Sequence, residues 1–222
     1  MKKFDGFFFL LRTKYTFFIK IKKINKTMLR TDIINFMIEK NDYKSYLEIG
    51  VRNYYDNCDK IKCVLKHAVD PSPQNKCDFI MTSDEFFSTL NENTKYDIIF
   101  IDGLHLSYQV DKDIVNSLLH LSENGTIILH DCLPSREEHQ HEKPTIGEWT
   151  GDVWKSILKI KIERPDLEIK IVDTDWGCGI LKRGSQEVYQ TDINPYNWIW
   201  YKDNFRNVLP ILTTDEFIEE YK

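Results

Sequence analysis

Residues 97–105 read DIIFIDGLH, an apolar run followed by a turn and a histidine. Four consecutive apolar residues at 98–101 are typical of a strand that is buried on both faces of a parallel sheet. Asp102 and Gly103 end the run, because an acid followed by a glycine favours a turn. The stretch therefore predicts a central strand of an α/β fold, with polar groups placed where the strand stops.

Toward the N-terminus, helical patterns alternate with short apolar strands. Thr31 or Asp32 is expected to cap a helix, which is followed by strands at 46–49, 64–69 and 79–81. Thr82 and Glu85 have the spacing of a capping box, so another helix is expected to begin there. These elements predict a chain that returns repeatedly to one sheet.

Toward the C-terminus the alternation continues. Val110, Ile114, Leu118 and Leu121 recur at helical spacing, so a helix is expected before the turn Asn124-Gly125, which leads into a strand at 126–129. A helix at 152–164 precedes a hairpin of strands 168–172 and 179–181, with Gly177 in the connection. The whole pattern predicts a Rossmann-like α/β fold: seven strands, mostly parallel, with a C-terminal antiparallel hairpin strand and helices on both faces.

The bulk composition fits one soluble domain. The 222 residues are enough for a single α/β core, which we place at residues 29–184 between an N-terminal arm, 1–28, and a C-terminal packing arm, 185–222. A net charge of −5 gives no general attraction to nucleic acid, so no nucleic-acid partner is expected. Five cysteines without a C-x-x-C spacing favour reduced thiols, and we expect a cytoplasmic protein.

The N-terminal arm is basic and rich in phenylalanine. Arg12 and Lys14 interrupt its apolar run, so a membrane-spanning helix is not expected. Such a segment can lie on an anionic membrane surface, contact a partner subunit or pack on its own domain. Peripheral membrane contact and a homo-oligomer are both left open.

Polar residues or glycine follow each of the first five predicted strands. In open parallel sheets ligands bind beyond the carboxyl ends of the strands. Gly50 permits close backbone approach to a ligand, and Asp70, about 20 residues on, is placed to bond a ribose diol. The pair indicates a cofactor that contains adenosine. Arg52 and Asn53 stand where a dinucleotide fingerprint needs more glycines, which disfavours NAD and FAD.

Acids and histidines follow two strands that are consecutive in sequence. If these strands are neighbours in the sheet, Asp102 and Asp131 end side by side, with His105 and His130 close to them. Two adjacent carboxylates need a proton or a cation between them, and Mg²⁺ is one candidate. His105 can then take the proton of a substrate hydroxyl as general base.

These residues resemble a known family. The motifs are residues 46–50 (YLEIG), 69–71, 83–87, 96–108, 130–131 and 151–155 (GDVWK). They look like bacterial class I S-adenosylmethionine-dependent methyltransferases, in particular the branch of macrocin-type sugar O-methyltransferases and their cephalosporin-hydroxylase-like relatives. The resemblance covers about residues 29 to 184. The run from Ile101 to Tyr108 is its most specific part.

The resemblance implies a set of roles. Glu48 and Gly50 flank the methionine part of the cofactor, Asp70 holds the ribose, and Ser83 with Asp84 meet the adenine. Asp102 and Asp131 are metal ligands, Asp102 is also counted with the cofactor-binding residues, and His105 is the general base. The chain departs from the family at residues 53–55, where a second glycine is usual, so cofactor affinity is left open.

We therefore expect an S-adenosylmethionine-dependent O-methyltransferase that acts on a hydroxyl of a small molecule, with a sugar or glycan precursor as first choice. Two alternatives stay open: a catalytically silent binding module of the same fold, and a nucleotide-dependent oxidoreductase. His139 and His141 lie in a charged loop that we expect to be a solvated lid rather than a metal site.

Overall fold

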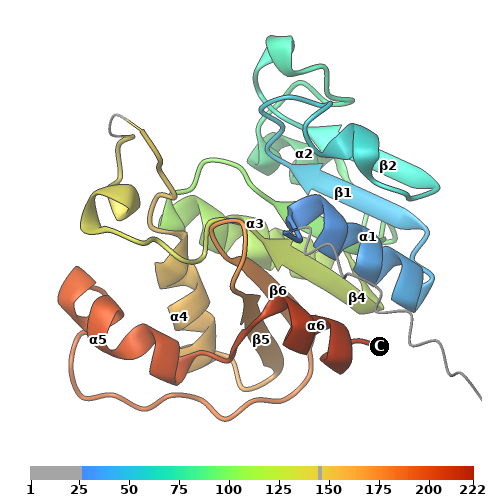
Figure 1. Cartoon of the computed structure of the whole chain (residues 1–222). Helices are drawn as coiled ribbons and strands as arrows, with labels where there is room; N and C mark the ends of the chain where they lie inside the picture. Colours follow the sequence, from blue (N-terminus) through green and yellow to red (C-terminus); the bar gives the residue numbers. More distant parts are fainter. Residues whose placement is uncertain (1–26, 145–146) are drawn as a thin grey trace, which may run out of the picture.

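The structure is a computed structural model that describes residues 27–144 and 147–222. In this part of the chain one mixed sheet has the strand order β2-β1-β3-β4-β6-β5-β7 (Figure 1). Its strands are β1 (Ser45–Ile49), β2 (Leu65–Val69), β3 (Tyr96–Ile101), β4 (Leu121–Leu129), β5 (Leu167–Val172), β6 (Cys178–Arg183) and β7 (Ile211–Leu212). Strand β6 runs antiparallel to both of its neighbours, and the other pairs are parallel.

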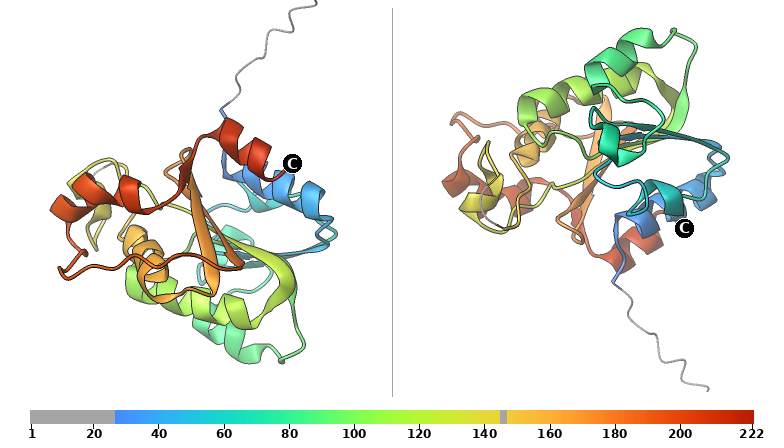
Figure 2. Two further views of the ribbon diagram at one scale, coloured as in Figure 1. Left: turned by 90° about the horizontal axis from the view of Figure 1, so that it is seen from below. Right: turned by 90° about the horizontal axis from the view of Figure 1, so that it is seen from above.

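Helices cover both faces of the sheet (Figure 2). They are α1 (Arg30–Asn41), α2 (Ser83–Thr89), α3 (Ser107–Leu119), α4 (Val153–Glu163), α5 (Trp198–Val208) and α6 (Thr214–Glu220), with short 3-10 turns at Cys58–Lys60, Pro73–Asn75 and Glu137–Gln140. Helices α1 and α6 share one core with the sheet, and α2, α3 and α4 share the other. The predicted fold class is confirmed.

Strand β3 lies at the centre of both cores, as its sequence predicts. Ile98 and Phe100 pack on the α1 and α6 side, while Ile99 and Ile101 pack toward α3 and α4. These four side chains are at most 3% exposed. Alternate residues of one strand therefore join the two layers, which explains the unbroken apolar run.

Two of the expected strands differ from the structure. Residues 79–81 do not form a strand, because only Phe79 pairs with Val69 as an isolated bridge. The seventh strand is β7, which adds to the far edge beside β5 and was not predicted. Three apolar residues are too few to distinguish a strand from an extended loop, and β7 has only two residues.

Two boundaries also differ. Leu29, rather than Thr31 or Asp32, is the N-cap of α1, and the Asp32 carboxylate instead accepts a hydrogen bond from the Leu29 N–H. The pair Asn124-Gly125 does not end an element but lies within β4, where the pairing with β3 shifts register. The capping box at Thr82 and Glu85 is confirmed.

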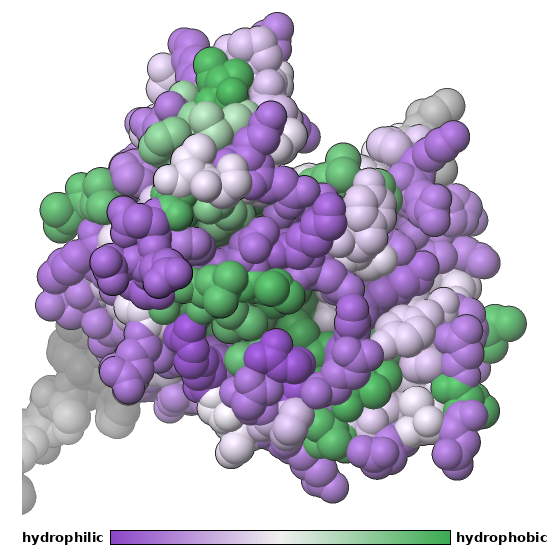
Figure 3. All heavy atoms as spheres, turned by 180° about the vertical axis from the view of Figure 1, so that it is seen from behind, coloured by the Kyte–Doolittle hydropathy of each residue, from purple (hydrophilic) through white to green (hydrophobic). Residues whose placement is uncertain are grey.

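The C-terminal segment packs on the domain. Tyr201 of α5 contacts Trp154 of α4 with ring centroids 4.8 Å apart, and Trp154 is fully buried. Phe217 of α6 meets Phe36 of α1 at 5.1 Å. Charged and polar side chains dominate the face opposite to that of Figure 1, with a hydrophobic patch near its centre (Figure 3).

Residues 1–26 of the predicted N-terminal arm lie outside the described residues. Among the described residues, no helix has the length and apolar character needed to cross a bilayer. All five cysteines are free thiols, of which Cys58, Cys132 and Cys178 are buried.

Candidate active site

The site lies where four adjacent parallel strands end in register. Val69, Ile49, Ile101 and Leu129 are register partners across four adjacent parallel strands, and each is the last residue of its strand. The next residues along the chain therefore emerge side by side at one edge.

A cavity of about 1290 Å³ opens at this edge. Its wall includes all eight residues that the sequence singles out, namely Glu48, Gly50, Asp70, Ser83, Asp84, Asp102, His105 and Asp131. The volume exceeds that of a usual small-molecule pocket, so it has room for a cofactor together with an acceptor.

Gly50 is required by the close approach of β1 to β3. Its φ is +89°, and a Cβ atom would lie 2.3 Å from the carbonyl oxygen of Asp102. The same approach is stabilised by the Asp102 N–H, which donates to the Ile49 carbonyl at 2.8 Å. Gly50 thus sets the spacing of the floor of the cavity, and any larger residue would displace Asp102.

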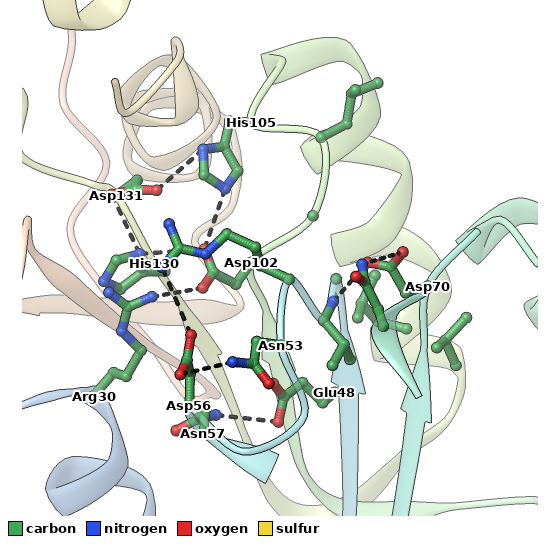
Figure 4. A pocket seen from close by; sticks show the side chains of 18 of the residues that line it. Arg30, Glu48, Asn53, Asp56, Asn57, Asp70, Asp102, His105, His130 and Asp131 are labelled. Carbon is green, nitrogen blue, oxygen red and sulfur yellow. Dashed lines mark hydrogen bonds and ion pairs between the residues drawn. The ribbon is translucent and has the colours of Figure 1, made fainter. Parts of the chain in front are cut away.

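Asp70 is fixed by its own turn (Figure 4). One carboxylate oxygen accepts from the Val51 N–H at 2.8 Å, and the other accepts from the Ser72 N–H at 2.8 Å and the Asn75 amide at 2.9 Å. A carboxylate oxygen has two lone pairs, so acceptor capacity remains for a ribose hydroxyl.

Ser83 and Asp84 form a polar end of the cavity with Gln109 of α3. The Gln109 side-chain amide lies 3.3 Å from Ser83 Oγ, 3.0 Å from Asp84 Oδ1 and 3.1 Å from Asp113 Oδ1. Gln109 therefore joins the start of α2 to α3 and orders this wall.

Glu48 is buried in a neutral hydrogen-bonded group. Its Oε2 accepts from the Tyr46 hydroxyl at 2.5 Å and from the Asn57 amide at 3.1 Å. Burial raises the pKa of Glu48 to about 7, although both hydrogen bonds act in the opposite direction. Glu48 is therefore protonated to a large extent near neutral pH.

The ends of β3 and β4 carry a cluster of two acids and two imidazoles, which we call the charge cluster: Asp102, His105, His130 and Asp131 (Figure 4). His105 bridges the acids, with Nε2 at 3.2 Å from Asp102 Oδ1 and Nδ1 at 3.1 Å from Asp131 Oδ2. His130 Nδ1 lies 3.2 Å from Oδ1 of each acid. The expected neighbourhood of the two acids is present, with imidazoles between them.

Two further residues of the network were not predicted. Arg30 of α1 donates to Asp102 Oδ2 at 2.7 Å and to both oxygens of Asp175, at 2.9 and 3.1 Å. Asp175 lies in the turn between β5 and β6. Strand β5 runs in the same direction as β4, because β6 is antiparallel to both, so Asp175 follows a strand end just as Asp131 does. Ligands bind beyond the carboxyl ends of parallel strands, and this rule, applied to the predicted strand 168–172, would have identified Asp175. No motif indicates Arg30.

Charge compensation sets the pKa values in the cluster. Burial alone would raise the pKa of Asp102, but the charge of His130 and the hydrogen bond with His105 outweigh it and hold that pKa well below its usual range. Burial would also lower the pKa of His105, yet its hydrogen bond to Asp102 and the charges of both acids raise it above 6.5. The pKa of His130 is likewise well above its ordinary value, because the charge of Asp102 outweighs burial.

The backbone of the cluster is strained. His105 and Asp131 have φ of 59° and Asp175 has φ of 48°, a left-handed region that non-glycine residues seldom adopt. Backbone strain of this kind occurs at functional sites where the surrounding structure enforces it.

The start of α4 supplies part of that support. The Asp152 N–H donates to the His105 carbonyl at 3.0 Å, and the Asp152 carboxylate accepts from the Ser107 N–H at 2.6 Å. Gly151 leaves the space that this contact needs, since a Cβ atom there would lie 1.9 Å from the His105 oxygen. The motif at 151–155, which had no assigned chemistry, thus anchors the loop that carries His105.

The charged loop near His139 is solvated at Glu137, Glu138, His141 and Glu142, as expected, but His139 itself is packed. His139 is 6% exposed, and its carbonyl accepts hydrogen bonds from the N–H and the hydroxyl of Thr150. Trp149 stacks on His105 with ring centroids 5.1 Å apart, and its indole N–H donates to the His141 carbonyl at 2.7 Å. The loop therefore places an aromatic wall on the imidazole of His105.

The arrangement can accept a proton and bind a cation. An imidazole held between two carboxylates at a cavity wall can act as a general base, because the acids stabilise its protonated form. Ligand atoms of Asp102, His105 and Asp131 also lie within 4.8 Å of one another, a spacing that could hold a metal ion.

Comparison with known proteins agrees with the fold. Residues 41–132 match a family model described as a methyltransferase domain. No curated protein matches the chain in sequence. A solved structure of an O-methyltransferase from Bacillus cereus in complex with SAH is 12% identical, with a TM-score of 0.52 over 68% of this chain and 79% of that one.

Two other solved structures are similar. The O-methyltransferase TomG from Streptomyces achromogenes, in complex with SAM, is 9% identical, with a TM-score of 0.50 over 68% of this chain and 78% of that one. A candidate caffeoyl-CoA O-methyltransferase from Staphylococcus aureus is 17% identical, with a TM-score of 0.52 over 69% of this chain and 82% of that one. At these identities the likeness is one of fold.

Proposed function

We propose that the chain is a class I S-adenosylmethionine-dependent methyltransferase that methylates a hydroxyl group of a small molecule, with a sugar or glycan precursor as the acceptor; the match of residues 41–132 to a methyltransferase domain and the shared fold support this. The observation that carries this proposal is the position of His105. Its imidazole lies between the buried carboxylate of Asp131 and the partly buried carboxylate of Asp102, in the wall of the cavity that also holds Gly50 and Asp70.

The cavity wall divides into a cofactor side and an acceptor side. Asp70 would hold the cofactor's ribose and Ser83 with Asp84 its adenine, while Glu48 and Gly50 would border its methionine part. The acceptor would lie against His105 and Trp149, which stack on each other in the wall at the other end of the row of strand ends.

In the reaction the acceptor oxygen attacks the methyl carbon of the sulfonium in line. The bond between that carbon and sulfur breaks, and its electron pair stays on sulfur, which gives S-adenosylhomocysteine. The hydroxyl proton passes to His105, and the product is a methyl ether. Such a transfer depends on positioning and on removal of one proton, which matches a site without a nucleophilic serine or cysteine.

The acids of the cluster stabilise the charge that the reaction leaves on His105. Asp102 and Asp131 each lie within 3.2 Å of one of its ring nitrogens, so the imidazolium forms between two negative charges. Trp149 covers the face of the ring and limits its rotation.

The donor set also fits a divalent cation such as Mg²⁺, which is part of the proposal. One ligand atom from each of Asp102, His105 and Asp131 lies within 4.8 Å of the other two, and these atoms are joined by ion pairs that a cation would replace. Asp102 and Asp131 would hold the ion through oxygens not taken by Arg30. A bound cation would orient the acceptor hydroxyl and make it more acidic.

The choice of a carbohydrate rests on the sequence motifs shared with sugar O-methyltransferases. Polar and aromatic side chains on the acceptor side, such as Glu148 and Trp149, suit a ligand with many hydroxyls. Cytoplasmic location, peripheral membrane contact and a homo-oligomer stay predictions.

Calorimetry with S-adenosylhomocysteine tests the proposal, together with transfer of a labelled methyl group to a panel of sugars and nucleotide sugars. We expect binding, thermal stabilisation and transfer that falls when a chelator removes divalent ions. No heat and no stabilisation at millimolar ligand would instead indicate a silent module of the same fold. Transfer only to non-carbohydrate hydroxyls would keep the reaction and change the acceptor.

A further inference from the structure

The cavity wall is rich in acids and poor in cations. Within the described residues, Arg30, Arg52 and Lys60 are the lysines and arginines that line it. The charged acids near the end of β1 include Asp56 and Asp102, while the neighbouring Glu48 is largely protonated. A ligand with a carboxylate group would be repelled here unless one of the three cations is available to it.

Two of these cations already have partners. The guanidinium of Arg30 donates to Asp102 and Asp175 over 2.7 to 3.1 Å. The ammonium of Lys60 donates to the Asp56 carbonyl at 2.8 Å. The guanidinium of Arg30 cannot turn to a ligand without losing hydrogen bonds to two acids. Lys60 keeps two further N–H donors, but a single ammonium does not match both oxygens of a carboxylate in the way that a planar guanidinium does.

Arg52 is different. Its side chain is 95% exposed, and it forms an ion pair with Asp56, with the closest nitrogen and oxygen atoms 3.6 Å apart. This separation is longer than a hydrogen bond, and an exposed pair of this kind contributes little to stability. Arg52 is therefore free to exchange Asp56 for a ligand carboxylate at small cost.

The position of Arg52 matches one end of the proposed cofactor. It is the second residue after Gly50, in the turn that lacks further glycines. If adenosine lies at Asp70 and the transferred methyl at His105, the methionine tail of the cofactor borders this turn. That tail ends in an ammonium and a carboxylate.

We infer that Arg52 binds the α-carboxylate of the methionine tail. In a glycine-rich turn the backbone approaches the ligand closely and holds it; in this turn the charged side chain of Arg52 holds it instead. The inference rests on the proposed function. A guanidinium matches a carboxylate in a two-pronged geometry, which makes the contact selective for that group.

Three ligands isolate the contact: S-adenosylhomocysteine, its decarboxylated analogue, and 5′-methylthioadenosine, which lacks the amino-acid tail. Calorimetry on Arg52→Gln is expected to show a loss of affinity for S-adenosylhomocysteine of about 10- to 100-fold. The two ligands without a carboxylate are expected to bind the variant and the parent protein within about twofold.

Matched variants sharpen the result. Arg52→Lys keeps the positive charge but loses the planar, two-pronged guanidinium, and we expect an intermediate loss of affinity for S-adenosylhomocysteine. Arg136→Gln removes a charge from an exposed arginine that does not line the cavity, and should change none of the three affinities. Thermal unfolding without ligand verifies that each variant is folded.

Equal losses for all three ligands, or no loss for S-adenosylhomocysteine, would overturn the role of Arg52. Failure of the parent protein to bind any of the three would contradict the proposed function instead. The two failures are therefore distinguishable.

Discussion

Two largely buried carboxyl groups, one in β1 and one directly after the adjacent β3, behave in opposite ways. Glu48 in β1 is 3% exposed and has neutral hydrogen-bond donors around it, and its pKa is raised to about 7. Asp102, at the end of β3, has an arginine and two imidazoles around it, and its pKa is lowered. Burial is common to both, so the difference comes from the charge of the partners.

The comparison distinguishes a carboxyl group that affects the stability of the fold from one that takes part in proton transfer. A carboxyl group that takes up a proton near neutral pH costs little to bury, and can serve as a neutral part of a wall. A carboxylate that stays charged needs cations beside it, and of those beside Asp102 the two imidazoles are the groups that can exchange protons with a substrate. We therefore expect changes in the charge cluster to affect turnover, and changes at Glu48 to affect the stability of the fold.

The largest effect is expected for His105→Ala. Loss of the general base should lower kcat by about 10²- to 10⁴-fold, while affinity for S-adenosylhomocysteine changes little, because His105 faces the acceptor. Steady-state kinetics and calorimetry measure the two quantities. His141→Ala, which removes an exposed imidazole, is the control and should leave kcat unchanged. Unchanged turnover in His105→Ala would remove the cluster from the reaction.

A second effect is expected in the pH profile. His105 must be neutral to accept a proton, so kcat/KM should rise with pH through the pKa of His105, which lies above 6.5. Asp131→Asn removes one of the charges that hold this pKa up. The rising limb should move to lower pH, and the plateau should fall by about tenfold or more, since the imidazolium is less well stabilised.

Asp111→Asn provides the matched control for that profile, because Asp111 pairs with Lys159 on the outer face of α3 and α4. It should leave the limb in place. A limb that moves to higher pH in Asp131→Asn would contradict the assignment of His105 as the titrating base.

The smallest effect is expected on thermal stability. The folded-state pKa of Glu48 is about 7, above the ordinary value of 4.5, so its contribution to stability is complete below 4.5 and lost as pH rises through 7. Glu48→Gln keeps the shape without the charge. At pH 8 its Tm should exceed that of the parent protein by roughly 5 °C, and the two should converge near pH 4.

Circular dichroism during heating measures the difference at both pH values. Glu163→Gln, at an exposed position at the end of α4, should show no such dependence on pH. A Tm difference for Glu48→Gln that is equal at pH 4 and pH 8 would show that Glu48 does not change its protonation in this range.

Local sequence was sufficient to predict where the strand ends meet. The run at 97–101 and the residues after each strand depend on periodicity and on the rule for parallel sheets, so Gly50, Asp70, Asp102 and Asp131 were all placed on one edge in advance. Their distances to one another then follow from strand register.

Long-range side-chain contacts could not be predicted in this way. Arg30 reaches Asp102 across 72 positions, and nothing in its own segment distinguishes it from a surface arginine. The burial of His139 depends on how its loop folds back, which periodicity does not describe. The predictions at 79–81 and β7 fail for a different reason: two or three residues are too few to show the periodicity of a strand.

The hydrogen bonds between Arg30 and Asp175 join residues 145 positions apart. During synthesis on the ribosome, the segment with α1 and β1 therefore emerges long before the turn that completes its partner. A nascent chain that stops short of residue 175 leaves the guanidinium without two of its carboxylate contacts. Contacts at such separation form late in folding, so binding competence is expected to arise only after most of the polypeptide has been made.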